Sequence, residues 1–230
     1  MSQKVSSSLD YLLEYLEKTE DFTLPSYKEL PGVDLYMEQV LKYVNGAIEP
    51  VTGKDNSLTS FMVNNYVKSR MISEPSKKKY SKEQIGSLIA ITLMKPSLSM
   101  ADMATLLEFE PRVSEDKNKL YSFWSDLEES LLHSISLETK AKVEKIKKIH
   151  EKYGKSDPER MDEIALDQLA YLALRLSIVA QANKLLSETI IESIRSSKED
   201  EEKEEKPETK EKPVAKKKEK SGKKKKKSAK

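Results

Sequence analysis

The sequence predicts an all-α fold, with a small winged helix-turn-helix, then a bundle of long helices, then a disordered lysine-rich C-terminal tail. Three observations support this prediction. Apolar residues recur at helical spacing through most of residues 6–196. Residues 58–107 divide into three short segments with helix-capping residues, arranged around a basic turn. Residues 198–230 contain almost no apolar side chains.

The N-terminal third predicts two helices joined by a linker. Leu9, Leu12, Leu13 and Leu16 follow the helical period and predict a helix over residues 6–20. Prolines and a glycine in residues 21–33 indicate an irregular linker. Asp34 is expected to cap a helix that continues to about residue 47. Residues 49–57 then predict a long turn.

Residues 58–107 carry the elements of the predicted winged helix-turn-helix. A short helix is expected after Thr59, and three lysines, Lys77, Lys78 and Lys79, form a compact basic turn beyond it. Ser81 and Gln84 have the spacing of a capping box and predict a second helix. A third helix is expected from Ser99, with Asp102 at the corresponding position.

Two long helices are expected in the C-terminal half. The first covers residues 115–148, with a possible break near residues 134–138. Asp157 and Pro158 predict the start of the second, which continues to about residue 196. Its apolar stripe between residues 164 and 186 is long enough to suggest a dimer partner. The alternative is that this helix packs back on the 115–150 helix of its own chain.

These elements divide the chain into four regions. Residues 1–33 are the N-terminal helix and linker, and residues 34–110 are the winged helix-turn-helix. Residues 111–197 are a helical packing or dimerisation region, and residues 198–230 are the charged tail.

Charge is distributed unevenly along the chain. The formal net charge is +2 over 230 residues. Residues 198–230 contain 15 lysines against 9 acids, whereas residues 1–197 contain 26 basic and 30 acidic residues. Within that mildly acidic body, residues 58–105 contain 7 basic and 3 acidic residues. This basic island is typical of a surface that binds phosphates, and the alternative is an ordinary solvated surface.

Composition argues against several classes of function. The chain has no cysteine, which excludes disulfides, thiolate metal sites and thiol redox sensing. No apolar run approaches the roughly 18 residues that a membrane span requires, and the N-terminus lacks a signal-peptide core. The protein is therefore expected in the cytoplasm, associated with the nucleoid if it binds DNA. The two histidines lie 17 residues apart, and no catalytic or phosphate-binding motif is evident, so neither an enzyme nor a cofactor is expected.

The residue types on the first short helix and on the basic turn suit double-stranded DNA. Amide side chains form paired hydrogen bonds with adenine, and lysine and arginine bind phosphates. Tyr66, Lys68 and the three turn lysines are expected to contact phosphates. The full set of candidate DNA-binding residues is Ser60, Asn64, Asn65, Tyr66, Lys68, Arg70, Lys77, Lys78, Lys79 and Tyr80.

Residues 63–72 and the sequence Lys79-Tyr80-Ser81 resemble the recognition helix and the end of the wing in MerR-type regulators. Two features depart from that pattern. Arg70 stands where the family usually has glycine, and the wing is shorter. Residues 30–40, 63–72 and 77–83 also resemble the bacterial family called domain of unknown function 1836, over about residues 24–180. The resemblance implies a MerR-like, regulatory protein.

The hypothesis from sequence is a DNA-binding transcriptional regulator of repressor type, acting as a homodimer on a short palindrome. One alternative is a protein-interaction scaffold with a winged helix that has lost DNA binding. Another is a protein that binds nucleic acid without sequence preference through its lysine-rich tail, where residues 212–230 hold eleven lysines and one acid.

Overall fold

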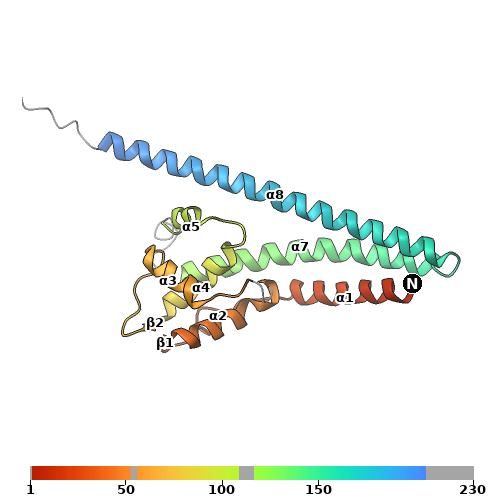
Figure 1. Cartoon of the computed structure of the whole chain (residues 1–230), viewed down its shortest axis with the longest axis horizontal. Helices are drawn as coiled ribbons and strands as arrows, with labels where there is room; N and C mark the ends of the chain where they lie inside the picture. The colour runs from red at the N-terminus through yellow and green to blue at the C-terminus, as the bar shows by residue number, and fades with distance from the viewer. Residues whose placement is uncertain (1, 53–55, 109–116, 206–230) are drawn as a thin grey trace, which may run out of the picture.

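The computed structural model describes residues 2–52, 56–108 and 117–205. Figure 1 shows two parts, a head made of short elements and a shaft made of long helices. The head comprises residues 22–107 and the first turns of α7 (Lys117–Tyr153). The shaft comprises α1 (Ser2–Glu20), the remainder of α7, and α8 (Pro158–Glu205). The predicted all-α class is confirmed, and the winged helix-turn-helix within it remains a prediction.

Helices α1 and α7 lie side by side along the shaft and are joined by ion pairs. The ammonium of Lys140 lies 3.1 Å from the carboxylate of Glu20, and that of Lys147 lies 2.6 Å from Asp10. Apolar side chains of both helices pack beneath these pairs, including Leu9 and Val143, which are fully buried. Helix α7 is continuous through residues 134–138, so the break considered there is wrong.

Helix α8 begins where the sequence predicted, because Asp157 caps it. The Asp157 carboxylate accepts the backbone N–H of Arg160 at 3.2 Å. The helix then packs on α1 and α7 through Ala165 and Leu172 before it diverges from α7 on the way back to the head (Figure 1). The alternative that α8 packs on its own chain is therefore correct for the first part of the helix.

Helix α8 is also longer than expected, because it continues to Glu205. The prediction of a disordered tail from Lys198 is thus wrong for residues 198–205. Glutamate and lysine are good helix formers, and adding residues to an existing helix is far easier than nucleating a new one. Residues 206–230 lie outside the described part of the chain.

A short antiparallel ladder joins two distant segments of the head. β1 (Leu35–Tyr36) pairs with β2 (Lys79–Tyr80), with Leu35 opposite Tyr80 and Tyr36 opposite Lys79. Because Leu35 and Tyr36 are extended, α2 (Met37–Thr52) begins later than the predicted start at Asp34. It also continues through Pro50 into the segment that was expected to be a turn.

Helix α4 (Lys82–Met94) forms the centre of the head and is buried on nearly every side. Its predicted capping box is present, since the Gln84 side chain accepts the Ser81 backbone N–H at 2.7 Å. Ser99 likewise caps α5 (Met100–Leu107), as predicted. The core around α4 also contains Phe22, Leu24 and Leu30, which come from the expected linker.

Among the residues that the structure describes, no helix is both long enough and apolar enough to cross a lipid bilayer.

Candidate nucleic-acid interface

Helix α3 (Ser60–Lys68) separates its buried and exposed residues into two clear faces. It begins at Thr59, whose hydroxyl accepts the backbone N–H of Met62 at 3.3 Å. Val63 and Tyr66 point into the core of the head and fix the helix in place. The exposed side chains follow helical spacing along the opposite face and are Ser60, Phe61, Asn64, Asn65 and Lys68.

Arg70 ends α3 in a conformation that usually requires glycine. The backbone N–H groups of Arg70 and Met71 donate to the carbonyls of Val67 and Tyr66, at 3.0 and 2.9 Å. This pair of bonds is a Schellman motif, and it places Arg70 in the left-handed region with φ of 60°. Arg70 therefore adopts a left-handed conformation that glycine would adopt without steric cost.

The basic turn forms a tight hairpin before β2. The backbone N–H of Lys79 donates to the carbonyl of Ser76 at 2.9 Å, which leaves Lys77 and Lys78 at the two central positions. Both have positive φ, 50° and 65°, as a type I′ turn requires. Asparagine and glycine usually occupy such positions, whereas here both side chains are exposed lysines.

Arg70, Lys77 and Lys78 are the non-glycine residues with positive φ in the described ranges. A left-handed backbone conformation costs a residue with a β-carbon roughly 1–2 kcal/mol. Glycine would avoid this cost at all three positions, yet each one carries a cation. Strained backbone that persists in a folded protein is typical of functional sites.

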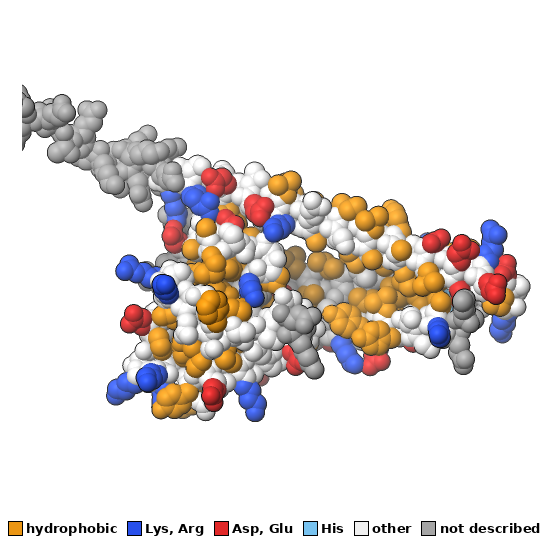
Figure 2. Space-filling model, viewed as in Figure 1, with side chains coloured by type: hydrophobic (Ala, Val, Ile, Leu, Met, Phe, Trp, Pro, Cys, Tyr) orange, Lys and Arg blue, Asp and Glu red, His pale blue; other side chains and the backbone are white. Residues whose placement is uncertain are grey.

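No ion pair neutralises these cations within the described residues. Lys68, Arg70, Lys77 and Lys78 are exposed, and no acidic side chain of residues 4–52, 56–108 or 119–198 lies within ion-pair distance of them. Figure 2 shows lysine and arginine side chains at the end of the head that carries α3 and β2. By contrast, Lys140 and Lys147 of α7 are paired with acids of α1.

Lys79 differs from its neighbours because it also packs within the protein. Its ammonium lies 4.8 Å from the centre of the Tyr36 ring, across the β1–β2 ladder. Such a cation–π contact orients the lysine without neutralising its charge. Tyr36 itself is 53% exposed and forms part of the same surface.

Two of the candidate residues do not lie on this surface. Tyr66 and Tyr80 are each 3% exposed and belong to the core of the head. Burial raises the pKa of both phenols. The expectation that Tyr66 contacts a phosphate does not fit this burial, and both tyrosines instead support α3 and the wing from beneath.

Phe61 is an exposed side chain of α3 that sequence analysis did not select. It is 72% exposed, between Ser60 and the two asparagines on the outer face of the helix. Aromatic side chains can contact the methyl group of thymine in the major groove. A helical projection of residues 60–68 would have revealed it, because positions 60, 61, 64, 65 and 68 share one face.

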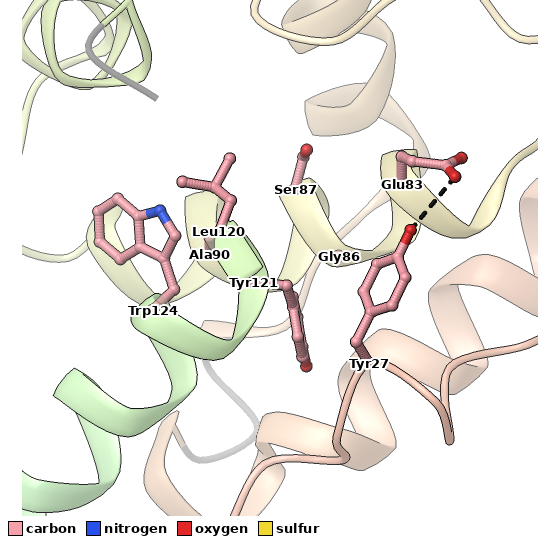
Figure 3. A pocket seen from close by; sticks show the side chains of 8 residues that line it. All are labelled: Tyr27, Glu83, Gly86, Ser87, Ala90, Leu120, Tyr121 and Trp124. Atoms are coloured by element: carbon pink, nitrogen blue, oxygen red, sulfur yellow. Dashed lines mark hydrogen bonds between the residues drawn. The ribbon is translucent and has the colours of Figure 1, made fainter. Parts of the chain in front are cut away.

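The cavity drawn in Figure 3 lies elsewhere, between α4 and the start of α7. Tyr27 donates its hydroxyl to Glu83 at one end of it, at 3.2 Å, and Trp124 lies at the other. A hydrogen bond from Ser81 lowers the pKa of Glu83, which favours its carboxylate form. The cavity volume of about 30 Å³ suits a water molecule, whereas ligand sites occupy roughly 300–1,000 Å³. It is therefore not a small-molecule site.

A larger surface groove runs between α1 and α2, but its charge does not suit DNA. The groove has a volume of about 1460 Å³. Its charged lining residues are four acids and two lysines: Glu14, Glu17, Asp21, Glu29, Lys18 and Lys42. A phosphate backbone would meet repulsion there, so the exposed surface formed by α3 and the basic turn remains the candidate.

The two histidines occupy structural positions in the shaft. His133 lies 3.2 Å from the carbonyl oxygen of Glu20. His150 and Asp162 form a buried pair between α7 and α8, with 2.8 Å between Nε2 and Oδ1. No group of three or more potential metal ligands occurs among the described residues.

Comparison with known proteins gives one match. Residues 25–127 match the family model described as Domain of unknown function (DUF1836). Searches of curated proteins and of solved structures found no match. The matched segment contains α2 to α5, both strands and the first turns of α7. It ends at residue 127, whereas the resemblance was expected to extend to about residue 180. The head of this protein is thus a match to the domain of unknown function family DUF1836.

Proposed function

We propose that this protein is a DNA-binding transcriptional regulator of repressor type, whose head contacts DNA through α3 and the wing. The wing is defined here as residues 74–80. The observation that carries the proposal is the placement of Arg70, Lys77 and Lys78. Three exposed cations occupy left-handed backbone positions in the segment that follows the amide-bearing helix α3. A folding requirement alone would favour glycine at these positions.

The exposed face of α3 provides groups of the kind that distinguish base pairs. Asn64 and Asn65 can each donate and accept hydrogen bonds at an adenine edge, and Phe61 can contact a thymine methyl group. The major groove is about 12 Å wide and admits one α-helix. In this proposal α2 and α3 form the helix-turn-helix, with α3 as the recognition helix.

The cations at and beyond the C-terminal end of α3 would fix the position of the helix on the duplex. Lys68 and Arg70 lie at the C-terminal end of α3, and the wing lysines lie beyond it. Phosphate contacts of this kind add affinity for every sequence and orient the base-contacting helix. The backbone of the wing is held by β1, so its lysines are presented on a defined hairpin.

Site-specific cross-linking would test this arrangement directly. Because the chain has no cysteine, a single introduced cysteine can carry a photo-activated cross-linker at a unique position. Asn65→Cys should cross-link to duplex DNA, whereas the matched control Ser177→Cys, on exposed α8, should not. Equal cross-linking at both positions, or none at Asn65, would contradict the proposal.

A second candidate function is a protein-interaction scaffold with a head that does not bind DNA. The observation in its favour is the set of large apolar side chains that α8 leaves exposed, such as Leu185 and Leu186 at 63% and 60%. The cross-linking experiment separates the two candidates, because a scaffold would give no DNA adduct through α3. A third possibility, binding only through the lysine-rich tail, would give adducts that do not depend on the position of the cysteine on the head.

A further inference from the structure

The apolar stripe along α8 is covered in its first part and open beyond it. Ala165 and Leu172 are 2% and 7% exposed, packed on α1 and α7. The same stripe continues towards the head at alternating intervals of four and three residues. Its later members are Leu176, Val179, Asn183, Leu186 and Ile190. The four apolar ones are 39–60% exposed, so the packing surface extends past its partner within the chain.

A second apolar stripe lies on the other side of the same helix. Leu174, Ile178 and Leu185 are 59%, 55% and 63% exposed. Residues 170–191 contain only three charged side chains. A helix that is apolar on several faces is normally buried, and α7 covers only the beginning of this one.

Helix α7 leaves apolar side chains open beside the same region. Phe123, Leu127, Leu131 and Ile135 recur every four residues and are 41–55% exposed. Figure 2 shows hydrophobic side chains along the sides of α7 and α8 that face the space between them. Exposed patches of this extent mark protein interfaces in soluble proteins.

We propose that a second copy of this chain covers this surface, with α8 of one copy packed against α8 of the other. Helices pair through stripes with four-three spacing, in which a single buried asparagine fixes register and the number of strands. Asn183 is the polar member of this stripe. The stripe itself carries no charge from residue 176 to residue 190, so an identical surface would meet no like-charge repulsion there.

The size of the open surface is adequate for a stable pair. A specific interface buries about 800 Å² on each partner. The four open apolar residues of the stripe and the four exposed apolar residues of α7 beside them are 39–60% exposed and together provide apolar surface of that order. This inference rests on the proposed function in one respect, since two paired heads would meet two half-sites of a palindrome.

Molecular mass in solution tests the inference, and the full-length protein is used without DNA. At micromolar concentration the wild type should have twice the mass of the 26.3 kDa chain. Val179→Glu should lower the mass to that of one chain, because its carboxylate would be buried against the apolar stripe of the second copy. Ser177→Glu adds the same charge on the side of α8 turned away from the stripe and should keep the doubled mass.

Other outcomes are equally informative. A wild type with the mass of one chain would overturn the inference, as would a Val179→Glu variant that keeps the doubled mass. Circular dichroism checks that Val179→Glu remains helical, and Leu186→Lys serves as the second stripe variant if it does not. Because mass is measured without DNA, a dimer that fails to bind DNA would overturn only the proposed function. A single chain that binds DNA would overturn only this inference.

Discussion

The guanidinium of Arg195, near the end of α8, lies 2.9 Å from the carboxylate of Asp102 in the first turn of α5. The same guanidinium donates to the Thr105 hydroxyl at 3.4 Å, and Ile191 is buried one turn earlier. Lys198 pairs with Glu108 beside them. The long helix thus returns to the head (Figure 1).

This contact predicts a measurable coupling between α8 and the head. Arg195→Ala and Asp102→Ala should each destabilise the protein, and a double-mutant cycle should give a coupling of about 0.2–1 kcal/mol, as for other partly exposed ion pairs. Chemical unfolding at about pH 7 measures it. A coupling near zero would indicate that Ile191 alone docks the helix.

The same pair predicts a dependence on pH. A hydrogen bond from Ser99, and then one from Arg195, lower the pKa of Asp102 below its ordinary value of 3.8. A carboxyl whose pKa falls on folding contributes stability above its unfolded pKa and loses it as the pH drops through the folded pKa. The coupling should therefore hold down to about pH 4 and vanish in stronger acid, and a coupling that increases on acidification would contradict this assignment.

The positive φ of Lys77 and Lys78 predicts that glycine at these positions raises folding stability and lowers affinity for DNA. Replacing Lys77 and Lys78 with glycine should stabilise the fold, because glycine adopts positive φ without the roughly 1–2 kcal/mol penalty per residue. The same variant should bind all DNA sequences more weakly and show a slope of log affinity against log salt that is shallower by about 2. Thermal unfolding and a salt series of binding measurements check the two effects.

Matched arginine substitutions provide the control for this prediction. Lys77→Arg with Lys78→Arg keeps both charges and the strain, so affinity and slope should stay close to those of the wild type. If the glycine variant binds as well as the arginine variant, the wing lysines do not contact phosphates.

Removing the amide side chains of α3 is expected to reduce the preference of the protein for particular DNA sequences. Asn64→Ala and Asn65→Ala remove hydrogen bonds that would be worth about 1–3 kcal/mol of discrimination at a base pair. At least one variant should bind its preferred and altered sites with more similar affinities, while its folding stability stays near that of the wild type. Competition binding with single-base variants of the site measures this. Unaltered preference in both variants would show that α3 does not contact bases.

The lysine-rich residues 206–230 are expected to raise affinity for duplex DNA without changing which site is preferred. Residues 206–230 follow α8, and they hold lysines in two dense runs at 216–218 and 223–227. Truncation after Glu205 should lower affinity for random duplex at low salt and leave site preference unchanged. The acids at 199–205 remain in the truncated chain. In the full chain they compete with DNA for the lysines of the tail, so the loss of affinity should be smaller than the number of removed lysines suggests. Identical salt curves for both chains would mean that the tail does not contact DNA.

Local signals in the sequence predicted the starts of four helices. Thr59, Ser81, Ser99 and Asp157 each cap a helix in the structure as expected. Such predictions succeed because a cap depends on residues two or three positions away. The exposure of Asn64 and Asn65 likewise followed from helical spacing.

Features that depend on distant residues were not predictable in this way. The strand Leu35–Tyr36 exists because it pairs with Lys79–Tyr80, and two residues carry no detectable period of their own. Tyrosine has both polar and apolar character, so its sequence position predicts a surface residue as readily as a buried one, and only the core of the head decides the burial of Tyr66. The positive φ of Arg70, Lys77 and Lys78 could not be inferred from lysine and arginine, which seldom adopt it.

The most direct test of the central claim is selection of bound sequences from a random duplex library, using the full-length wild type and the Asn64→Ala/Asn65→Ala variant. The account predicts that the wild type enriches an inverted repeat with half-sites about one helical turn apart. It also predicts that the variant loses this enrichment while still binding duplex. Failure of the wild type to enrich any motif, or the same motif with both proteins, would contradict the claim that α3 contacts the bases.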